Sequence, residues 1–248
     1  ADAPSEAVYL RDEETAAVWS ATPAPAPADV PYLIRHGAGY TRYAHHSNGL
    51  EHDLRVYVAP EAPVKLLRLR VKNTWARRRR ITVTYYVNWV LGTTAESTRA
   101  HVVPEYDAES QTILARNAYS AEFGAKVAFA GASKALHGLT TDRDEFLGHL
   151  GGMRKPDGLT RVGLSGAVRA GSDPCAAVQV HVDLEAGAEE ELHFMLGQGA
   201  DRQHALELGC GAGLSLPLLE ARATEVTAVD GHRRLLQQAQ AASSKAVL

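Results

Sequence analysis

The fold is decided by the stretch KLLRLRVKNTWARRRRITVTYYVNWVL, residues 65–91, in which two alternating runs of apolar and polar residues follow one another. In the first run Leu67, Leu69 and Val71 fall on one face of an extended chain, and basic residues fall on the other. A period of two with one apolar face predicts a half-buried strand rather than a helix.

The second run repeats the pattern with β-branched and aromatic residues. Ile81, Val83 and Tyr85 alternate with threonine and tyrosine, which is typical of a strand. We expect the two runs to form adjacent antiparallel strands. The basic run Arg77 to Arg80 is then interpreted as a solvated hairpin turn between them and not as a phosphate or nucleic-acid patch.

Further strands are predicted on both sides of this stretch, with turn residues such as Ser47-Asn48-Gly49 between them. Helical periodicity is nearly absent before Gly199. Residues 1–199 are therefore predicted to form one mainly β domain, a sandwich of antiparallel sheets. The other expected strands lie near Val8–Arg11, Tyr40–His46, Gly49–Val58, Thr112–Asn117, Lys126–Ala132, Gly163–Ala170, Ala176–Leu184 and Glu190–Gly197.

Composition narrows the classes of function. The 248 residues are 45% hydrophobic, enough for a sizeable core, and the formal net charge of -3 argues against nucleic acid as a partner. No apolar stretch approaches the roughly 20 residues of a membrane-spanning helix, so we expect no direct membrane insertion. The chain begins at Ala1 without Met, as expected of a processed product or a piece of a longer chain.

Motifs for catalysis or metal binding are weak. The two cysteines, Cys175 and Cys210, form no CxxC pair, and a nucleophile elbow is absent. His45 and His46 are consecutive, so on a strand they face opposite sides, and we predict no metal site. Acidic pairs such as Glu51/Asp53 are interpreted as ordinary surface groups, although paired carboxylates can cleave glycosides.

After Gly199 the pattern changes to that of a short α/β tail, residues 200–248. A predicted strand ending at Leu208 opens into a glycine turn, which resembles the first motif of methyltransferases that use S-adenosylmethionine. This alternative implies cofactor contacts from Gly209, Gly211, Gly213 and Asp230. Because few residues follow Asp230, we expect a truncated Rossmann-like segment or a foreign tail, and no bound cofactor.

Several ordered motifs within residues 1–199 resemble one family. They are YLRDEETAAVWS (9–20), RHGAGYTRYAHHSNGLEHDLRVYV (35–58), VKLLRLRVKNTWARRRRITVTYYVNWVLGTT (64–94), DRDEFLG (142–148) and DPCAAVQVHVDLEAG (173–187). The resemblance is to the β-supersandwich domain of glycoside phosphorylases, glycoside hydrolase family ninety-four. It implies a galactose-mutarotase-like antiparallel sandwich that precedes a helical-barrel catalytic domain in complete enzymes.

The resemblance also implies a role. Since the family's acid catalyst and phosphate site belong to the barrel, we expect a non-catalytic domain of a β-glucan-synthesising or phosphorolysing enzyme. We expect it to bind a β-glucan or a gluco-oligosaccharide. Two alternatives remain open: a domain that forms a homodimer without a ligand, and a fragment of a methyltransferase. The expected location is cytoplasmic, alone or as part of an inner-membrane enzyme. The candidate sugar-binding residues in the matched motifs are Arg35, His36, Tyr40, Arg143, Glu145 and Phe146.

Overall fold

A computed structural model describes residues 5–60, 62–171, 173–209, 226–227 and 246–247. Strands dominate this part of the chain, as predicted. The strands are β1 (Glu6–Asp12), β2 (Val18–Ser20), β3 (Leu33–Gly37), β4 (Tyr40–Ser47), β5 (Leu50–Val58), β6 (Val64–Asn73), β7 (Arg79–Asn88), β8 (Val102–Asp107), β9 (Thr112–Asn117), β10 (Val127–Ala132), β11 (Gly138–Asp142), β12 (Pro174–Leu184), β13 (Glu189–Gly199), β14 (Val226–Thr227) and β15 (Ala246–Val247).

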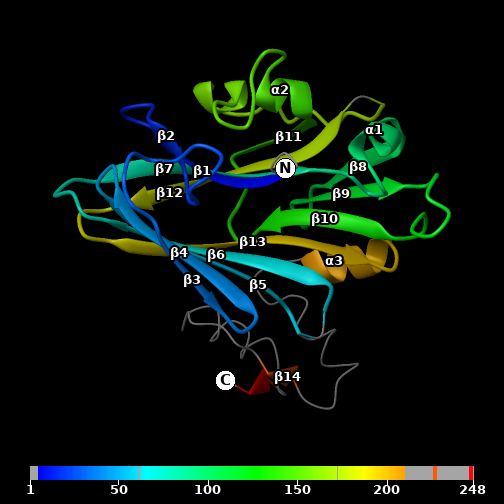
Figure 1. The fold of residues 1–248 in the computed structure, drawn as a ribbon, viewed down its shortest axis with the longest axis horizontal. Coiled ribbons are helices and arrows are strands. Elements are labelled where there is room, and N and C mark those ends of the chain that lie inside the picture. The colour runs from blue at the N-terminus through cyan, green and yellow to red at the C-terminus, as the bar shows by residue number, and fades with distance from the viewer. Residues whose placement is uncertain (1–4, 61, 172, 210–225, 228–245, 248) are drawn as a thin grey trace.

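The strands form two large antiparallel sheets that face each other, which Figure 1 shows as two layers. The order is β11-β12-β7-β1-β2 in the five-stranded sheet and β3-β4-β5-β6-β13-β10-β9-β8 in the eight-stranded sheet. The expected antiparallel supersandwich is confirmed. The short strands β14 and β15 pair with each other in parallel.

Helices are few and short within the described residues. They are α1 (Ala95–Thr98), α2 (Arg143–Leu147) and α3 (Arg202–Gly209), with 3-10 turns η1 (Arg99–His101) and η2 (Asp157–Thr160). No helix in the described ranges is long and apolar enough to cross a bilayer.

The main core lies between the sheets. On β7 the side chains of Ile81, Val83 and Tyr85 are fully buried, and on β6 Leu69 and Val71 meet them from the other layer. The alternating positions read from the sequence therefore point inward as predicted. At about 25 cal/mol per Å² of apolar surface removed from water, this interior is the dominant stabilising term.

One prediction about these strands is wrong. β6 pairs with β5 and β13, whereas β7 pairs with β1 and β12, so the two runs lie in different sheets and not in a hairpin. The connection after Asn73 crosses from one layer to the other. Local alternation fixes which face of a strand is buried, but it carries no information on which neighbour the strand takes.

The crossing is held by a buried cation, so the basic run is not a simple solvated turn. The Arg79 side chain is completely buried, pairs with Asp12 of β1 and lies 3.8 Å over the Trp75 ring. Burial alone would raise the pKa of the Asp12 carboxyl, but hydrogen bonds from Arg79 and the nearby backbone outweigh it and lower that pKa. This corner joins both sheets.

The turn expected at Ser47-Asn48-Gly49 is present, and in the structure it is a two-residue hairpin loop between β4 and β5. Asn48 and Gly49 both have positive φ, 49° and 69°, as a type I′ turn requires. Gly49 also fits tightly against the corner, because a Cβ there would lie 2.1 Å from Nε1 of Trp75. A side chain at this position would push the indole away from Arg79.

Each sheet also carries a cover on part of its outer face (Figure 1). Phe146 of α2 packs on the five-stranded sheet, where its ring stacks on Tyr86 at 4.8 Å and meets Tyr9 at 6.0 Å. On the eight-stranded sheet, Ala205 and Leu208 of α3 pack against an apolar cluster that includes Phe129.

Other predictions about local structure need correction. Residues 163–170 are irregular and not a strand, since Gly166 takes a φ of 77° there. The run Ala205–Leu208, predicted as a strand, belongs to helix α3, which Asp201 starts by accepting a 2.8 Å hydrogen bond from the His204 N–H. The strands β2, β3, β8 and β11 were not predicted.

Candidate functional site

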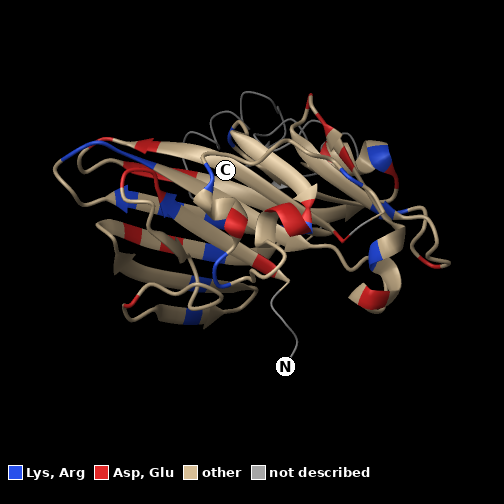
Figure 2. Ribbon diagram, turned by 90° about the horizontal axis from the view of Figure 1, so that it is seen from above, with Lys and Arg blue, Asp and Glu red and all other residues tan. Residues whose placement is uncertain are grey.

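The outer face of the eight-stranded sheet bears polar rows where α3 does not cover it. Residues directly opposite each other on antiparallel strands point to the same side, so the pairing registers define these rows. One row runs across β4, β5, β6 and β13 through Ala44, Asp53, Arg70 and Glu191. Figure 2 shows Lys and Arg in blue on neighbouring strands, with acidic residues in red among them.

Asp53 is the centre of this face. The Arg42 guanidinium binds it in a forked arrangement, with Nε 2.9 Å from Oδ1 and Nη2 2.6 Å from Oδ2. Arg70 donates a further hydrogen bond to Oδ2 at 3.2 Å from the other side, and its own Nη1 lies 3.5 Å from Glu189. Two parallel charge-assisted bonds hold the carboxylate in a fixed orientation.

The electrostatics keep Asp53 ionised. Partial burial would raise the pKa of its carboxyl, but the hydrogen bonds and charge of Arg42, with the charges of Arg70 and Arg68, lower it below its usual value. A carboxylate that stays ionised accepts hydrogen bonds and cannot supply a proton. The arrangement is suited to binding rather than to general acid catalysis.

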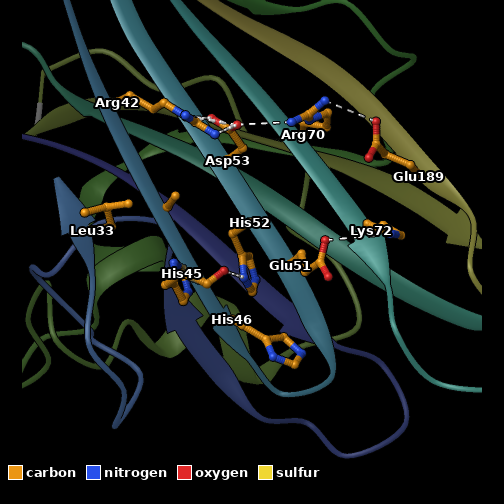
Figure 3. Close-up of a pocket in the computed structure, with 11 residues that line it drawn as sticks. Leu33, Arg42, His45, His46, Glu51, His52, Asp53, Arg70, Lys72 and Glu189 are labelled. Carbon is orange, nitrogen blue, oxygen red and sulfur yellow. Dashed lines mark hydrogen bonds and ion pairs between the residues drawn. The ribbon is translucent and has the colours of Figure 1, made fainter. Parts of the chain in front are cut away.

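These groups surround a hollow of about 340 Å³, shown with its lining side chains in Figure 3. Leu33 lies at one side of it, and the Glu51–Lys72 pair, 3.8 Å apart, lies at another. The hollow has both polar and apolar walls, as small-ligand sites do. Its lining is Leu33, Arg42, Ala44, His45, His46, Glu51, His52, Asp53, Arg70, Lys72 and Glu189.

Two stacked histidines belong to the same lining. The rings of His45 and His52 lie 4.0 Å apart and nearly parallel, and Tyr32 covers the other side of His45 at 4.1 Å. The Trp19 Nε1–H of the opposite sheet donates to Nε2 of His52 at 3.0 Å. Burial lowers the pKa of His45 to about 4 and that of His52 to about 3, so both rings are neutral near pH 7.

Three of the predicted sugar-binding residues lie on this same sheet. Arg35 and His36 are on β3 and Tyr40 begins β4, all exposed. His36 Nδ1 lies 3.1 Å from Thr41 Oγ1, and the Arg55 guanidinium lies 4.8 Å over the Tyr40 ring. They border the polar rows but do not line the hollow.

The other three predicted residues lie on α2, over the five-stranded sheet, and the structure does not bring them near the first three. Phe146 is fully buried and offers no surface to a sugar. Arg143 is 3.1 Å from Asp173. Glu145 accepts hydrogen bonds from Thr140 and Ser165, which outweigh the effect of burial and lower its pKa.

The residues of the alternative cofactor site are only partly described. Gly209 is the buried last residue of α3, packed near Phe129, and so does not follow a strand as a nucleotide-binding glycine would. Gly211, Gly213 and Asp230 lie outside the described residues.

Sequence reasoning missed Arg42 and Arg70 and left Asp53 among ordinary surface carboxylates. A signal was present, because Arg68, Arg70 and Lys72 share the outward face of β6. Acidic residues at alternate positions of the neighbouring strand could have indicated their partners, had the pairing register been known.

The two facing antiparallel sheets define a class, the β-supersandwich domains. The chain belongs to the glycosyl hydrolase 94 supersandwich domain family, whose profile matches residues 1–209. The family expected from the sequence motifs is thereby confirmed. The match includes α3, which packs against β13 and β10.

Individual relatives agree with this family. The chain is 33% identical over 198 residues to the cyclic beta-(1,2)-glucan synthase NdvB of Rhizobium meliloti, covering 78% of this chain and 7% of that protein. It is 29% identical over 204 residues to solabiose phosphorylase of Paenibacillus borealis, covering 81% and 27%. The chain therefore spans 7% of the length of the first relative and 27% of the length of the second.

A solved structure supports the fold alone. A bacterial glucoamylase complexed with acarbose superposes with a TM-score of 0.52 at 7% identity, covering 94% of this chain and 30% of the other. Identity this low carries no functional argument, but the same architecture occurs within that longer chain.

Proposed function

We propose that this chain is a non-catalytic carbohydrate-binding domain of a β-glucan-synthesising or phosphorolysing enzyme, and that the hollow over β4, β5 and β6 holds a gluco-oligosaccharide. The observation that carries the proposal is the Arg42–Asp53–Arg70 arrangement, fixed in position and open to a pocket. A cytoplasmic location is part of the same proposal.

The chemistry of sugar recognition supports this assignment. Neighbouring hydroxyls of a hexose both donate and accept hydrogen bonds, so they match a carboxylate held beside guanidinium donors. The volume, about 340 Å³, falls within the range of small-ligand sites, roughly 300 to 1,000 Å³. Leu33, which is 53% exposed, offers an apolar contact for C–H groups of a sugar ring.

The titrating groups support a role without chemistry of its own. Each carboxyl whose pKa departs from its usual value in the described residues has it lowered, whereas a general acid needs it raised. The thiol of Cys175 is fully buried, and that burial raises its pKa well above its usual value, which makes it a poor nucleophile. The carboxyls are those of Asp12, Asp53, Asp107, Glu145 and Asp183.

The test is titration of the chain with β-1,2-gluco-oligosaccharides, followed by calorimetry and amide chemical shifts. We expect saturable binding in the millimolar range, with shifts centred on β4 to β6 and a loss of at least tenfold in affinity for Asp53→Asn. The matched control is Asp183→Asn, whose carboxylate also binds an arginine in a fork but on the other sheet. Equal binding by both variants, or none by the wild type, would reject the proposal.

A second candidate function is dimerisation through β3. This strand ends the eight-stranded sheet, all five of its residues are exposed, and Leu33 and Ile34 are 53% and 41% exposed. An open strand edge with apolar side chains can pair with a second copy. Light scattering distinguishes a dimer from a monomer, and Ile34→Lys should abolish a dimer of this kind.

A further inference from the structure

Four arginines lie in one line across the outer face of the eight-stranded sheet. The registers place Arg35 of β3 opposite Arg42 of β4, Arg42 opposite Arg55 of β5, and Arg55 opposite Arg68 of β6. Residues opposite each other on antiparallel strands have Cβ atoms about 4.5 to 5.5 Å apart and point to the same side. We call these four residues the arginine row.

Such a row is unfavourable unless anions compensate it, since like charges directly opposite each other destabilise a sheet. Two members have carboxylate partners in the structure. Arg42 binds Asp53 in a fork, and Arg68 lies 3.9 Å from Glu191. Half of the row is thereby compensated from within the chain.

The other two members, Arg35 and Arg55, pair with no carboxylate of the described residues. Arg35 is exposed at the sheet edge. Arg55 is held with its guanidinium over the Tyr40 ring at 4.8 Å, and its Nε is buried without a hydrogen-bond partner. A buried donor without an acceptor costs free energy, and a donor fixed by stacking is already positioned for one.

We propose that Arg35 and Arg55, on either side of Arg42, form a binding site for one oxyanion group, a sulfate or phosphate that is free or carried on a saccharide. Guanidinium groups bind such anions through paired N–H donors, and two arginines without a carboxylate partner leave positive charge that an anion can compensate. Binding would supply the missing acceptor for Arg55. This inference goes beyond the proposed function and does not require that neutral glucans bind.

A second arginine cluster on the molecule provides the contrast. Arg80 binds Asp183 in a fork, and Arg78 lies 3.6 Å from Asp183 and 3.4 Å from Glu185. Two cations there face two carboxylates, so the cluster needs no external anion. It serves as the internal control.

The experiment compares sodium sulfate with sodium chloride at equal ionic strength on the full chain. The Nε–H signals of the arginines are followed by NMR, and thermal unfolding is measured in parallel. We expect a saturable shift of the Arg55 signal with sulfate and not with chloride. Arg35→Gln should weaken this binding by about tenfold or more, because it removes a charge-assisted partner of the anion.

The thermal measurement separates site binding from a general salt effect. Sulfate stabilises folded proteins by exclusion from their surface, so some rise in the unfolding temperature is expected for every variant. The additional rise that comes from binding should vanish in Arg35→Gln/Arg55→Gln and persist in Arg78→Gln/Arg80→Gln. If the double variant does not fold, the test rests on Arg35→Gln alone. Because this side chain is exposed, the single substitution should leave the fold intact.

The source of the anion is distinguished by glucose 6-sulfate, inorganic sulfate and glucose. Tighter binding of the sulfate ester supports a saccharide-borne group, and equal binding of ester and free ion supports the free anion. The proposal is overturned if sulfate and chloride act alike, or if Arg35→Gln/Arg55→Gln keeps the full sulfate response. Failure of the neutral-sugar site would show separately, as loss of glucan binding with the sulfate response intact.

Discussion

The outer faces of the two sheets differ in what covers them. Over the five-stranded sheet, α2 closes an aromatic cluster around Phe146, which is fully buried. Over β3 to β6 of the eight-stranded sheet many outward residues are charged, and a hollow remains around Asp53. Both faces belong to antiparallel strands, so the side chains at alternate positions decide whether a face is buried or stays open.

The difference indicates which of the two outer faces is available to a ligand. An aromatic face must be covered, because leaving it in water forfeits the hydrophobic term. Covering a charged face costs free energy, because every buried charge needs a partner. The open face therefore keeps its charged groups available to a ligand, while the covered face contributes stability.

The largest effect is expected on the covered face. Phe146→Ala should reduce the free energy of unfolding by about 3 to 5 kcal/mol, because it leaves a cavity between Tyr86 and Tyr9. Urea denaturation followed by circular dichroism measures it. Leu150→Ala, at a fully exposed position, is the control and should change little. A loss below 1 kcal/mol would mean that α2 adds no cover.

The next effect concerns the histidine stack beneath the open face and depends on pH. In the unfolded chain His45 takes up a proton near its ordinary pKa of 6.5, whereas in the folded protein it does so only near 4. Protons thus favour the unfolded chain in this window. The stability from His45 is complete above pH 6.5 and is lost as the pH falls toward 4, by up to about 3 kcal/mol.

His45→Phe keeps a flat ring between Tyr32 and His52 and removes this titration. We expect its unfolding free energy to fall less steeply than the wild type's between pH 6.5 and 4. Carboxyls with lowered pKa values lose their contribution to stability at still lower pH, and they do so in the variant and the wild type alike. His149→Gln, whose side chain is 90% exposed, should follow the wild type. Parallel curves for all three proteins would contradict the pKa shift.

A smaller effect is expected in the hollow itself. Asp53→Asn removes the charge that holds Arg42 and Arg70, and should cost about 1 to 2 kcal/mol of unfolding free energy. Asp183→Asn removes a more exposed partner and should cost about 0.5 kcal/mol or less. Thermal unfolding at low and high salt measures both. Equal losses would remove the distinction between a fixed site and an ordinary ion pair.

The smallest effect has the opposite sign. Arg35→Gln relieves repulsion within the arginine row, so in chloride at low ionic strength it should raise the unfolding free energy by about 0.2 to 0.5 kcal/mol. Screening should erase this gain at high salt. Arg116→Gln makes the same change of net charge on β9, outside the row, and should bring no comparable gain. A loss of stability in Arg35→Gln would speak against uncompensated repulsion.

The strands and their buried faces could be predicted from the sequence because alternation is a local property. Expected ranges agree closely with β1, β4, β5, β9, β10, β12 and β13. Sheet membership could not be predicted, since the crossing after Asn73 depends on Arg79 reaching Asp12, 67 residues away. Helix α2 was missed because five residues are too few to display a helical period.

The candidate site was predicted only in part for a related reason. The matched motifs indicated Arg35, His36 and Tyr40, which lie on the sheet that carries the hollow. Phe146 is a core residue instead, because its motif forms helix α2 over the other sheet. The hollow is made by contacts between strands. Arg42 and Asp53 come together only because of the register in which β4 and β5 pair.

The position of β13 has a consequence for how the protein is made. This strand is the last of the sandwich along the chain, yet it lies between β6 and β10 and joins the two halves of the eight-stranded sheet. At a translation rate of about 5 to 20 residues per second, β6 leaves the ribosome many seconds before β13 does. Until then its edge stays unpaired, so the nascent chain is expected to depend on chaperones during this interval.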